Sequence, residues 1–169
     1  MQTAGTLKRF DPDALRDILY IRRNSFPSEW TYDDAEAYYR AMLMSEANIH
    51  IFLRDDGNRI GYLLAIPHND AVAELKRDDP GMEEDSKRYY IETVAILPEF
   101  RGQGGFSKML RKLTGELGPK AGKISLHARI TNGFSKIMQQ KGSVTKIRRI
   151  EQWKYYRYEE PADYLEVEF

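Results

Sequence analysis

Hydrophobic residues recur with two different spacings along the chain, and each change of spacing marks a new element. Helical spacing follows the acidic, proline-containing start Asp11-Pro12-Asp13 and appears again after the capping-box pattern at Thr31. Residues 48–54 alternate, and residues 59–66 form the returning strand after the turn Asp55-Asp56-Gly57-Asn58, which predicts a hairpin. The expected elements are, in order, a strand at 6–10, helices that begin near Asp11 and Thr31, and strands at 48–54 and 59–66.

The pattern changes most sharply within residues 91–117. Residues 91–97 form a nearly continuous apolar run, which is typical of a strand covered on both faces. Pro98 ends that strand because proline cannot donate a hydrogen bond to a ladder. A glycine-rich turn, RGQGG at 101–105, comes next. Apolar residues then recur at helical spacing at Phe106, Met109, Leu110, Leu113 and Leu117.

The remainder of the chain contains more strand pattern than helix pattern. Residues 67–87 are charged and proline-containing, and we interpret them as a solvated connector or a specificity loop with a short helix at 71–77. The other expected elements are a strand at 123–128, a helix ending near Lys141, and a hairpin of strands at 143–158 and 164–169 around a turn at 159–163. The whole pattern predicts an α/β class fold.

Composition narrows the class of protein. The 26 basic residues balance the 26 acidic ones, which argues against a general nucleic-acid-binding surface. With no cysteine, the chain has no disulfide, no zinc–thiolate site and no cysteine acyl-enzyme. No apolar run approaches the ~20 residues that span a bilayer, and the N-terminus lacks a signal-peptide core. We therefore expect a single cytoplasmic domain over residues 1–169, with no membrane partner and no metal.

A strand that leads through glycines into a helix is a physical device for holding phosphate. The first amides of a helix lack intrahelical partners and carry partial positive charge. The alternative is an ordinary turn with flexible glycines. The Walker pattern is absent. A dinucleotide fingerprint nearly matches at Gly102, Gly104 and Ser107, but Arg129 follows the next expected strand where an acidic residue is needed.

The string VAILPEFRGQGGFSKML resembles the acyl-CoA signature of the GNAT superfamily of N-acyltransferases, Arg/Gln-x-x-Gly-x-Gly/Ala after a strand. Arg101 and Gly104 match its fixed positions, and Phe106 departs from its last one. The resemblance implies a mixed, mostly antiparallel twisted sheet of about six or seven strands with about four helices, splayed at the central strand. It implies acetyl-CoA as co-substrate, held at Val94, Ala95, Ile96, Arg101, Gly102, Gln103, Gly104, Gly105, Phe106 and Ser107.

A second segment also resembles the family, whose fourth helix often reads Asn-x-x-Ala-x-x-hydrophobic-Tyr before a Gly. Asn132 matches the Asn and Ser135 replaces the Ala, so the resemblance implies coenzyme contacts at both residues. The family's tyrosine, a general acid for the leaving thiolate, would fall at Met138 or Gln139. Neither residue can protonate a thiolate.

Glu92 and a nearby phenol are the candidate catalytic residues. Glu92 shares a strand face with apolar residues, so partial desolvation would raise its pKa toward that of a general base. The alternative is a carboxylate paired with Arg59 or Arg88. Tyr156 is the candidate acid, and its neighbours in the expected hairpin are Tyr155 and Tyr158; the alternative for each is cross-strand aromatic pairing.

Other residues allow two interpretations. Phe26 and Trp30 either plug the core or wall the acceptor site, which in the family lies beside the loop between the first two helices. His127, on an expected strand, is a satisfied core histidine or a catalyst. The basic cluster is a solvated face, or it contacts an acidic acceptor or the coenzyme phosphates; its members are Lys146, Arg148, Arg149 and Lys154.

The resemblance implies an acyltransferase that moves an acetyl group from acetyl-CoA to a primary amine without an acyl-enzyme. The acceptor would be a small amine, an amino acid or a peptide amine, and the enzyme a monomer or homodimer. The missing tyrosine motivates an alternative, a catalytically weak acyl-CoA-binding sensor or interaction module. A nucleotide-binding protein that uses the glycines is a third alternative.

Overall fold

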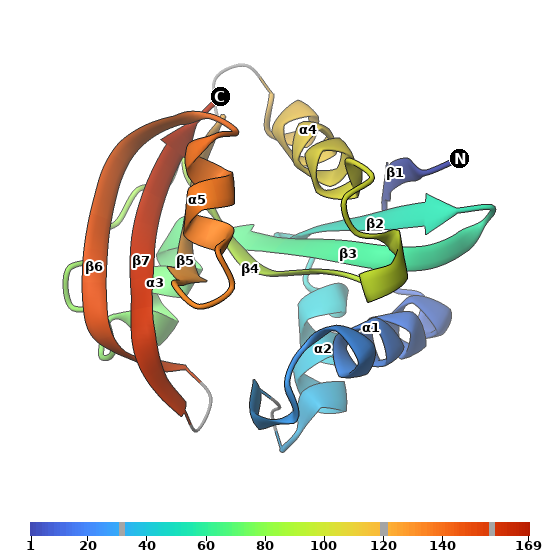
Figure 1. The fold of residues 1–169 in the computed structure, drawn as a ribbon, viewed down its shortest axis with the longest axis horizontal. Helices are drawn as coiled ribbons and strands as arrows, with labels where there is room; N and C mark the ends of the chain where they lie inside the picture. Colours follow the sequence, from blue (N-terminus) through green and yellow to red (C-terminus); the bar gives the residue numbers. More distant parts are fainter. Residues whose placement is uncertain (31–32, 119–121, 156–157) are drawn as a thin grey trace. The chain divides into compact units, whose positions relative to one another are not determined.

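The computed structural model describes residues 1–30, 33–118, 122–155 and 158–169. Its described residues form one mixed sheet of seven strands in the order β1-β2-β3-β4-β5-β7-β6 (Figure 1), which confirms the predicted α/β class and sheet type. The strands are β1 (Thr3–Thr6), β2 (Ile49–Asp55), β3 (Asn58–Pro67), β4 (Arg88–Ile96), β5 (Lys123–Arg129), β6 (Ser143–Tyr155) and β7 (Tyr158–Glu168).

Five α-helices and two short 3-10 turns lie between the strands in the described part of the chain. The α-helices are α1 (Pro12–Ser25), α2 (Ala35–Met44), α3 (His68–Leu75), α4 (Gly105–Leu117) and α5 (Phe134–Gln139). The 3-10 turns are η1 (Ser28–Trp30) and η2 (Pro98–Phe100). No helix among the described residues is long and apolar enough to cross a membrane.

The chain divides into two compact units. Unit 1 contains Met1–Ala65 and Thr93–Glu116, and unit 2 contains Ile66–Glu92 and Leu117–Phe169. The division passes through β3 and β4, so each unit owns part of both strands. The single domain expected from the sequence stays a prediction.

In unit 1, β1 pairs antiparallel with β2, and β2 pairs antiparallel with β3. The same unit contains α1, α2 and α4. The acidic start predicted for the first helix is confirmed, because the Asp11 side chain accepts a hydrogen bond from the Asp13 amide. Gly61 on β3 admits the neighbouring backbone of β4. A Cβ at this position would lie 2.8 Å from the Ala95 carbonyl oxygen.

In unit 2, β4 and β5 run parallel and pair only over Arg88–Tyr90 and Lys123–Ser125. From Ile91 onward no pairing joins the two strands within their described residues, so the ladder ends where splaying was expected. β5 pairs antiparallel with β7, and β7 with β6.

The first strand and the C-terminal hairpin differ from the sequence prediction. β1 covers Thr3–Thr6 instead of 6–10, because its ladder with β2 ends at Thr6 and Ile51. In the C-terminal hairpin Tyr155 pairs with Tyr158 and Lys154 with Glu159, so the turn predicted at 159–163 is wrong. Pro161 is tolerated inside β7 because it lies opposite the register shift between Ile150 and Trp153, where no ladder hydrogen bond is needed.

Candidate active site

The glycine loop, residues 101–105, connects η2 to α4 in unit 1. Gly102 and Gly104 have φ of 74° and 76°, the left-handed region that favours glycine. A Cβ at either position would meet no atom within 4 Å, so conformation and not space requires glycine there. The amides of Gly102, Gln103, Gly104 and Gly105 make no hydrogen bond with any described residue. These free donors at the start of α4 fit the phosphates of a coenzyme.

Gln2 holds the glycine loop from the N-terminal segment. Its side chain is buried, and its Nε2 donates to Oε1 of Gln103 at 3.0 Å. The Gln2 carbonyl accepts from Nζ of Lys108 at 3.0 Å, which joins the same residue to α4. Gly105 is close-packed here, because a Cβ on it would lie 2.5 Å from Cδ2 of Leu53. The loop is therefore fixed by contacts that leave its amides available.

Arg101 does not extend away from the loop. Its Nε donates to the Ile96 carbonyl at 2.9 Å, and its Nη2 donates to the Ser25 carbonyl at 3.1 Å. Oγ of Ser25 also donates to the Ile96 carbonyl, at 3.3 Å. The charge that we expected near phosphate thus lies on main-chain oxygens of β4 and α1.

The aromatic loop, residues 26–30, directly follows α1. The rings of Phe26 and Trp30 lie 5.8 Å apart and are both half-buried, so neither is a fully buried core residue. Buried Arg22 anchors the loop, donating to the Tyr39 hydroxyl at 2.9 Å and to the Trp30 carbonyl. Its guanidinium lies 5.3 Å from the centre of the Phe26 ring, within cation–π range.

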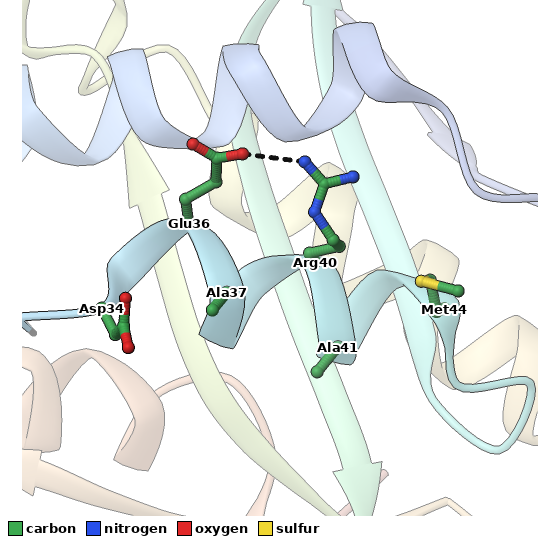
Figure 2. Close-up of a pocket in the computed structure, with 6 residues that line it drawn as sticks. All are labelled: Asp34, Glu36, Ala37, Arg40, Ala41 and Met44. Carbon is green, nitrogen blue, oxygen red and sulfur yellow. Dashed lines mark hydrogen bonds and ion pairs between the residues drawn. The ribbon is translucent and has the colours of Figure 1, made fainter.

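An open depression of about 430 Å³ follows the exposed face of α2 in the same unit. Figure 2 shows its lining, Asp34, Glu36, Ala37, Arg40, Ala41 and Met44. Glu36 and Arg40 pair with each other at 2.8 Å. All these described lining residues come from α2 or its N-cap.

The His127 network, formed by Asp79, Tyr90, His127 and Arg148, is the main buried polar cluster of unit 2. Nε2 of His127 lies 2.9 Å from Oδ2 of Asp79, and Nδ1 lies 2.9 Å from the Tyr90 hydroxyl. Because a carboxylate only accepts, Nε2 carries the proton, and Tyr90 donates its hydroxyl proton to Nδ1. Arg148 completes the chain with contacts of 2.7 Å to each Asp79 oxygen.

Burial sets the charge states of the His127 network. Burial lowers the pKa of His127, and the hydrogen bond to Asp79 only partly offsets that effect, so the imidazole is neutral. Burial alone would raise the pKa of Asp79, but hydrogen bonds from His127 and Arg148 hold it well below its ordinary value. The Trp153 ring stacks on His127 at 3.9 Å and keeps water away. The histidine is thus a satisfied buried residue, as one of the two interpretations held.

Glu92 is half-buried on β4, two residues beyond Tyr90 and on the same strand face. Burial raises the pKa of the Tyr90 phenol well above its ordinary value, and the Glu92 carboxylate adds to that rise. The two arginines considered as Glu92 partners bind other carboxylates. Arg59 binds Asp11 and Asp17, and Arg88 binds Asp85 and Glu166.

The second family-like segment begins in the turn after β5, at Asn132, and continues through α5. The Asn132 side chain accepts from the Phe134 amide at 3.0 Å, at the start of α5. The Ser135 hydroxyl is buried and donates to Oδ2 of Asp163 at 2.7 Å. Of the two candidates for the family's tyrosine position, Met138 is fully buried and Gln139 donates to the Ser135 hydroxyl at 3.2 Å, and α5 itself contains no tyrosine. Tyr156, the proposed acid, lies outside the described residues.

The basic cluster on β6 is balanced by acidic residues of unit 2. Arg148 pairs with Asp79 and Arg149 with Asp163. The two lysines have exposed or half-exposed partners, Lys146 with Glu83 and Lys154 with Glu159. The partly exposed Lys146, Arg149 and Lys154 favour the interpretation of a solvated face, whereas Arg148 belongs to the buried His127 network.

Sequence reasoning missed Asp79 and Tyr90. Asp79 falls in a stretch that reads as a surface loop, although the turn-forming Asp-Pro-Gly at 79–81 was a local signal. Tyr90 continues the alternation of Glu92 and Val94 by one step, and that alternation could have placed its phenol on the face of Glu92.

A family model for the GNAT family of acetyltransferases matches residues 15–136. The chain matches no curated protein. Among solved structures, Arabidopsis thaliana NAA60 in complex with acetyl-CoA aligns with 17% identity over 100% of this chain and 98% of that chain, with a TM-score of 0.71. Aminoglycoside 6'-N-acetyltransferase complexed with coenzyme A aligns with 12% identity over 98% and 96%, with a TM-score of 0.70.

Ribosomal-protein-S18-alanine N-acetyltransferase from Escherichia coli aligns with 16% identity over 99% of this chain and 94% of that chain, with a TM-score of 0.66. At such low identities the three structures show a shared fold. The family model is stronger evidence of family membership, because it matches more than half of the sequence and includes β4, the glycine loop and α4. The chain therefore belongs to the GNAT family of acetyltransferases, and so to the acyltransferases.

Proposed function

We propose that this protein transfers an acetyl group from acetyl-CoA directly to a primary amine. The observation that carries the proposal is the glycine loop, whose amides at Gly102–105 make no hydrogen bond with any described residue. Two of its glycines hold left-handed φ values that other residues adopt only with strain. Family membership gives this anion site its ligand, the pyrophosphate of a coenzyme.

The chain binds the coenzyme mainly through its backbone. We expect main-chain groups of Val94, Ala95 and Ile96 to pair with pantetheine as a peptide pairs with a strand edge. The amides from Gly102 to Ser107 hold the pyrophosphate, and Phe106 adds bulk beside it. Asn132 contributes from the turn before α5. Ser135 would have to give up its hydrogen bond to Asp163 to contribute its hydroxyl.

Glu92 accepts the proton that the amine must lose. The amine nitrogen forms a bond to the thioester carbonyl carbon, the carbon–sulfur bond breaks, and the electron pair leaves with sulfur. Amides of β4 near Val94 stabilise the negative charge on the carbonyl oxygen. Tyr156 returns a proton to the thiolate. A CoA thiol has a pKa not far above the ~8.5 of cysteine, so departure without an acid is also chemically feasible.

The acceptor contacts the aromatic loop. Phe26 and Trp30 supply half-buried rings there, and Arg22 holds the Trp30 carbonyl and contacts the Phe26 ring. Two neighbours are named for amine substrates, an aminoglycoside and the alanine of ribosomal protein S18. A primary amine on a small molecule or a peptide is the acceptor class that we propose here.

Calorimetric titration with acetyl-CoA tests the proposal. Desulfo-CoA and NAD serve as controls, and a screen of amines follows. We expect micromolar affinity for acetyl-CoA, about −8 kcal/mol, and no binding of NAD. Absence of acetyl-CoA binding would overturn the proposal, and equal binding of NAD would favour a nucleotide-binding protein.

The missing tyrosine on α5 favours a second candidate, an acyl-CoA-binding sensor without efficient catalysis. Glu92→Gln separates the two. We expect it to lower kcat by about 10²-fold or more while the acetyl-CoA Kd stays the same. Glu99→Gln, an exposed glutamate seven residues on, is the matched control. Unchanged turnover in Glu92→Gln would remove the proposed base, and micromolar coenzyme binding without turnover of any amine would establish the sensor.

A further inference from the structure

The Arg101 guanidinium joins three segments of unit 1. Arg101 belongs to the glycine loop, its Nε donates to the last carbonyl of β4 at Ile96, and its Nη2 donates to the last carbonyl of α1 at Ser25. Ser25 lies 76 residues away in sequence, so this contact is a long-range tie.

The position suits a guanidinium electrostatically. The carbonyls of the last helical turn have no intrahelical partners and carry partial negative charge. Arg101 satisfies one of these carbonyls at α1. The Ile96 carbonyl receives two donors, Arg101 and the Ser25 hydroxyl, so the end of β4 and the end of α1 are bound to each other as well.

The aromatic loop begins at the residue after Ser25. Its other anchor is Arg22, one turn earlier on α1, which holds the Trp30 carbonyl and contacts the Phe26 ring. The start of the loop is thus fixed by Arg101 and its end by Arg22. The glycine loop and the aromatic loop are far apart in sequence, and the Arg101 side chain connects them.

We propose that the Arg101 side chain is a positioning residue for the aromatic loop and not a ligand of phosphate. The coenzyme is held by the amides of the glycine loop, while the guanidinium orients Phe26 and Trp30 for the acceptor. This inference rests on the proposed function, because it assigns the two loops to the two substrates of that reaction.

The two possible roles of Arg101 respond differently to lysine. Phosphate accepts lysine as a point charge, so a phosphate ligand would tolerate Arg101→Lys. The contact seen here needs two donors on a planar fork, Nε and Nη2, which lysine does not have. We therefore compare Arg101→Lys with Arg101→Ala. Arg111→Ala, an exposed arginine on α4, is the control for lost charge.

Tryptophan fluorescence measures the aromatic loop without any substrate. The chain has two tryptophans, and Trp153 is 2% exposed and stacked on His127. Quenching by acrylamide therefore reports Trp30. We expect the quenching constant to rise about twofold in both Arg101 variants, because the loop opens locally, and to stay at the wild-type value in Arg111→Ala. Unchanged quenching in both Arg101 variants would overturn the proposal.

Steady-state kinetics supply the second measurement. We expect both Arg101 variants to raise the acceptor KM about tenfold, while the acetyl-CoA Kd changes less than about threefold. A tenfold weaker acetyl-CoA Kd in Arg101→Ala that Arg101→Lys restores would make Arg101 a phosphate ligand and refute the inference. If the wild type fails to bind acetyl-CoA, the proposed function fails, but the quenching of Trp30 still decides whether Arg101 positions the loop.

Discussion

The glycine loop and the His127 network place their polar groups in opposite ways. The loop is contiguous in sequence and offers main-chain donors that no described residue accepts. The network collects side chains up to 69 residues apart, and nearly every polar group in it has a partner inside unit 2. Free donors on a fixed backbone are suited to binding a ligand, whereas paired buried groups are suited to stabilising the fold.

The difference also predicts how each region fails. A change in the His127 network leaves buried groups without partners and should appear first in stability. A change in the glycine loop disturbs donors that only a ligand uses, so it should appear first in coenzyme affinity. Measuring both stability and coenzyme affinity on the same variants shows whether the two regions have distinct roles.

Asp79→Ala should have the largest effect. Asp79 is 1% exposed and binds His127, Arg148 and the Gly81 amide. Its removal leaves a buried imidazole N–H and a partly buried guanidinium unpaired, so we expect the free energy of unfolding to fall by about 3–5 kcal/mol. Urea denaturation followed by circular dichroism measures the change.

Asp78→Ala is the matched control for Asp79→Ala. Asp78 directly precedes Asp79 in the sequence, and its carboxylate forms a loose ion pair of 3.7 Å with exposed Arg77. We expect a loss below about 1 kcal/mol. Equal losses in the two variants would show that the His127 network contributes no more stability than a surface ion pair.

Acidification should weaken the fold before it affects the glycine loop. Burial lowers the pKa of His127 in the folded state. Below about pH 6.5 this imidazole is therefore protonated in the unfolded chain but stays neutral in the folded one until the pH is lower. The stability is therefore complete above pH 6.5 and declines as pH falls. His50 and His68 shift in the same direction, also through burial.

Urea unfolding at pH 7.5, 6.5 and 5.5 measures this decline. Each proton taken up on unfolding lowers the free energy of unfolding by at most about 1.4 kcal/mol per pH unit below the unfolded pKa. We therefore expect the free energy of unfolding to fall by about 1–3 kcal/mol between pH 7.5 and pH 5.5. His127→Gln should make the slope shallower. A flat profile in the wild type would mean that the folded protein protonates its buried histidines as readily as the unfolded chain.

Gly104→Ala should affect coenzyme affinity more than stability. Alanine at φ 76° costs about 1–2 kcal/mol, and the loop can avoid that cost by turning its amides away from the phosphate position. We expect the acetyl-CoA Kd to rise about tenfold by calorimetry. Gly115→Ala within α4 is the control, since it adds about 0.5–1 kcal/mol of stability and leaves Kd unchanged. An acetyl-CoA Kd in Gly104→Ala equal to that of the wild type would show that the glycine loop does not bind the coenzyme.

The same comparison explains what the sequence could predict. The strand, the turn and the helix around RGQGG follow from hydrophobic spacing, Pro98 and glycine within one short window. The His127 network does not, because Asp79 reaches His127, and Arg148 reaches Asp79, only through the packing of β5, β6 and the 67–87 region. The hairpin turn was misplaced for a related reason. Pro161 has the local signature of a turn, and only the register shift on β6 makes it acceptable within a strand.

The smallest expected effect comes from the contact between Gln2 and Gln103, which supports the glycine loop without forming it. Loss of this hydrogen bond in Gln2→Ala should loosen the loop and raise the acetyl-CoA Kd about threefold. Gln103→Ala removes the same bond from the other side, so a double-mutant cycle with both changes should give a coupling of about 0.5–1 kcal/mol in binding free energy. Additive effects would mean that the glycines alone hold the loop, and its coenzyme affinity would then depend on local sequence only.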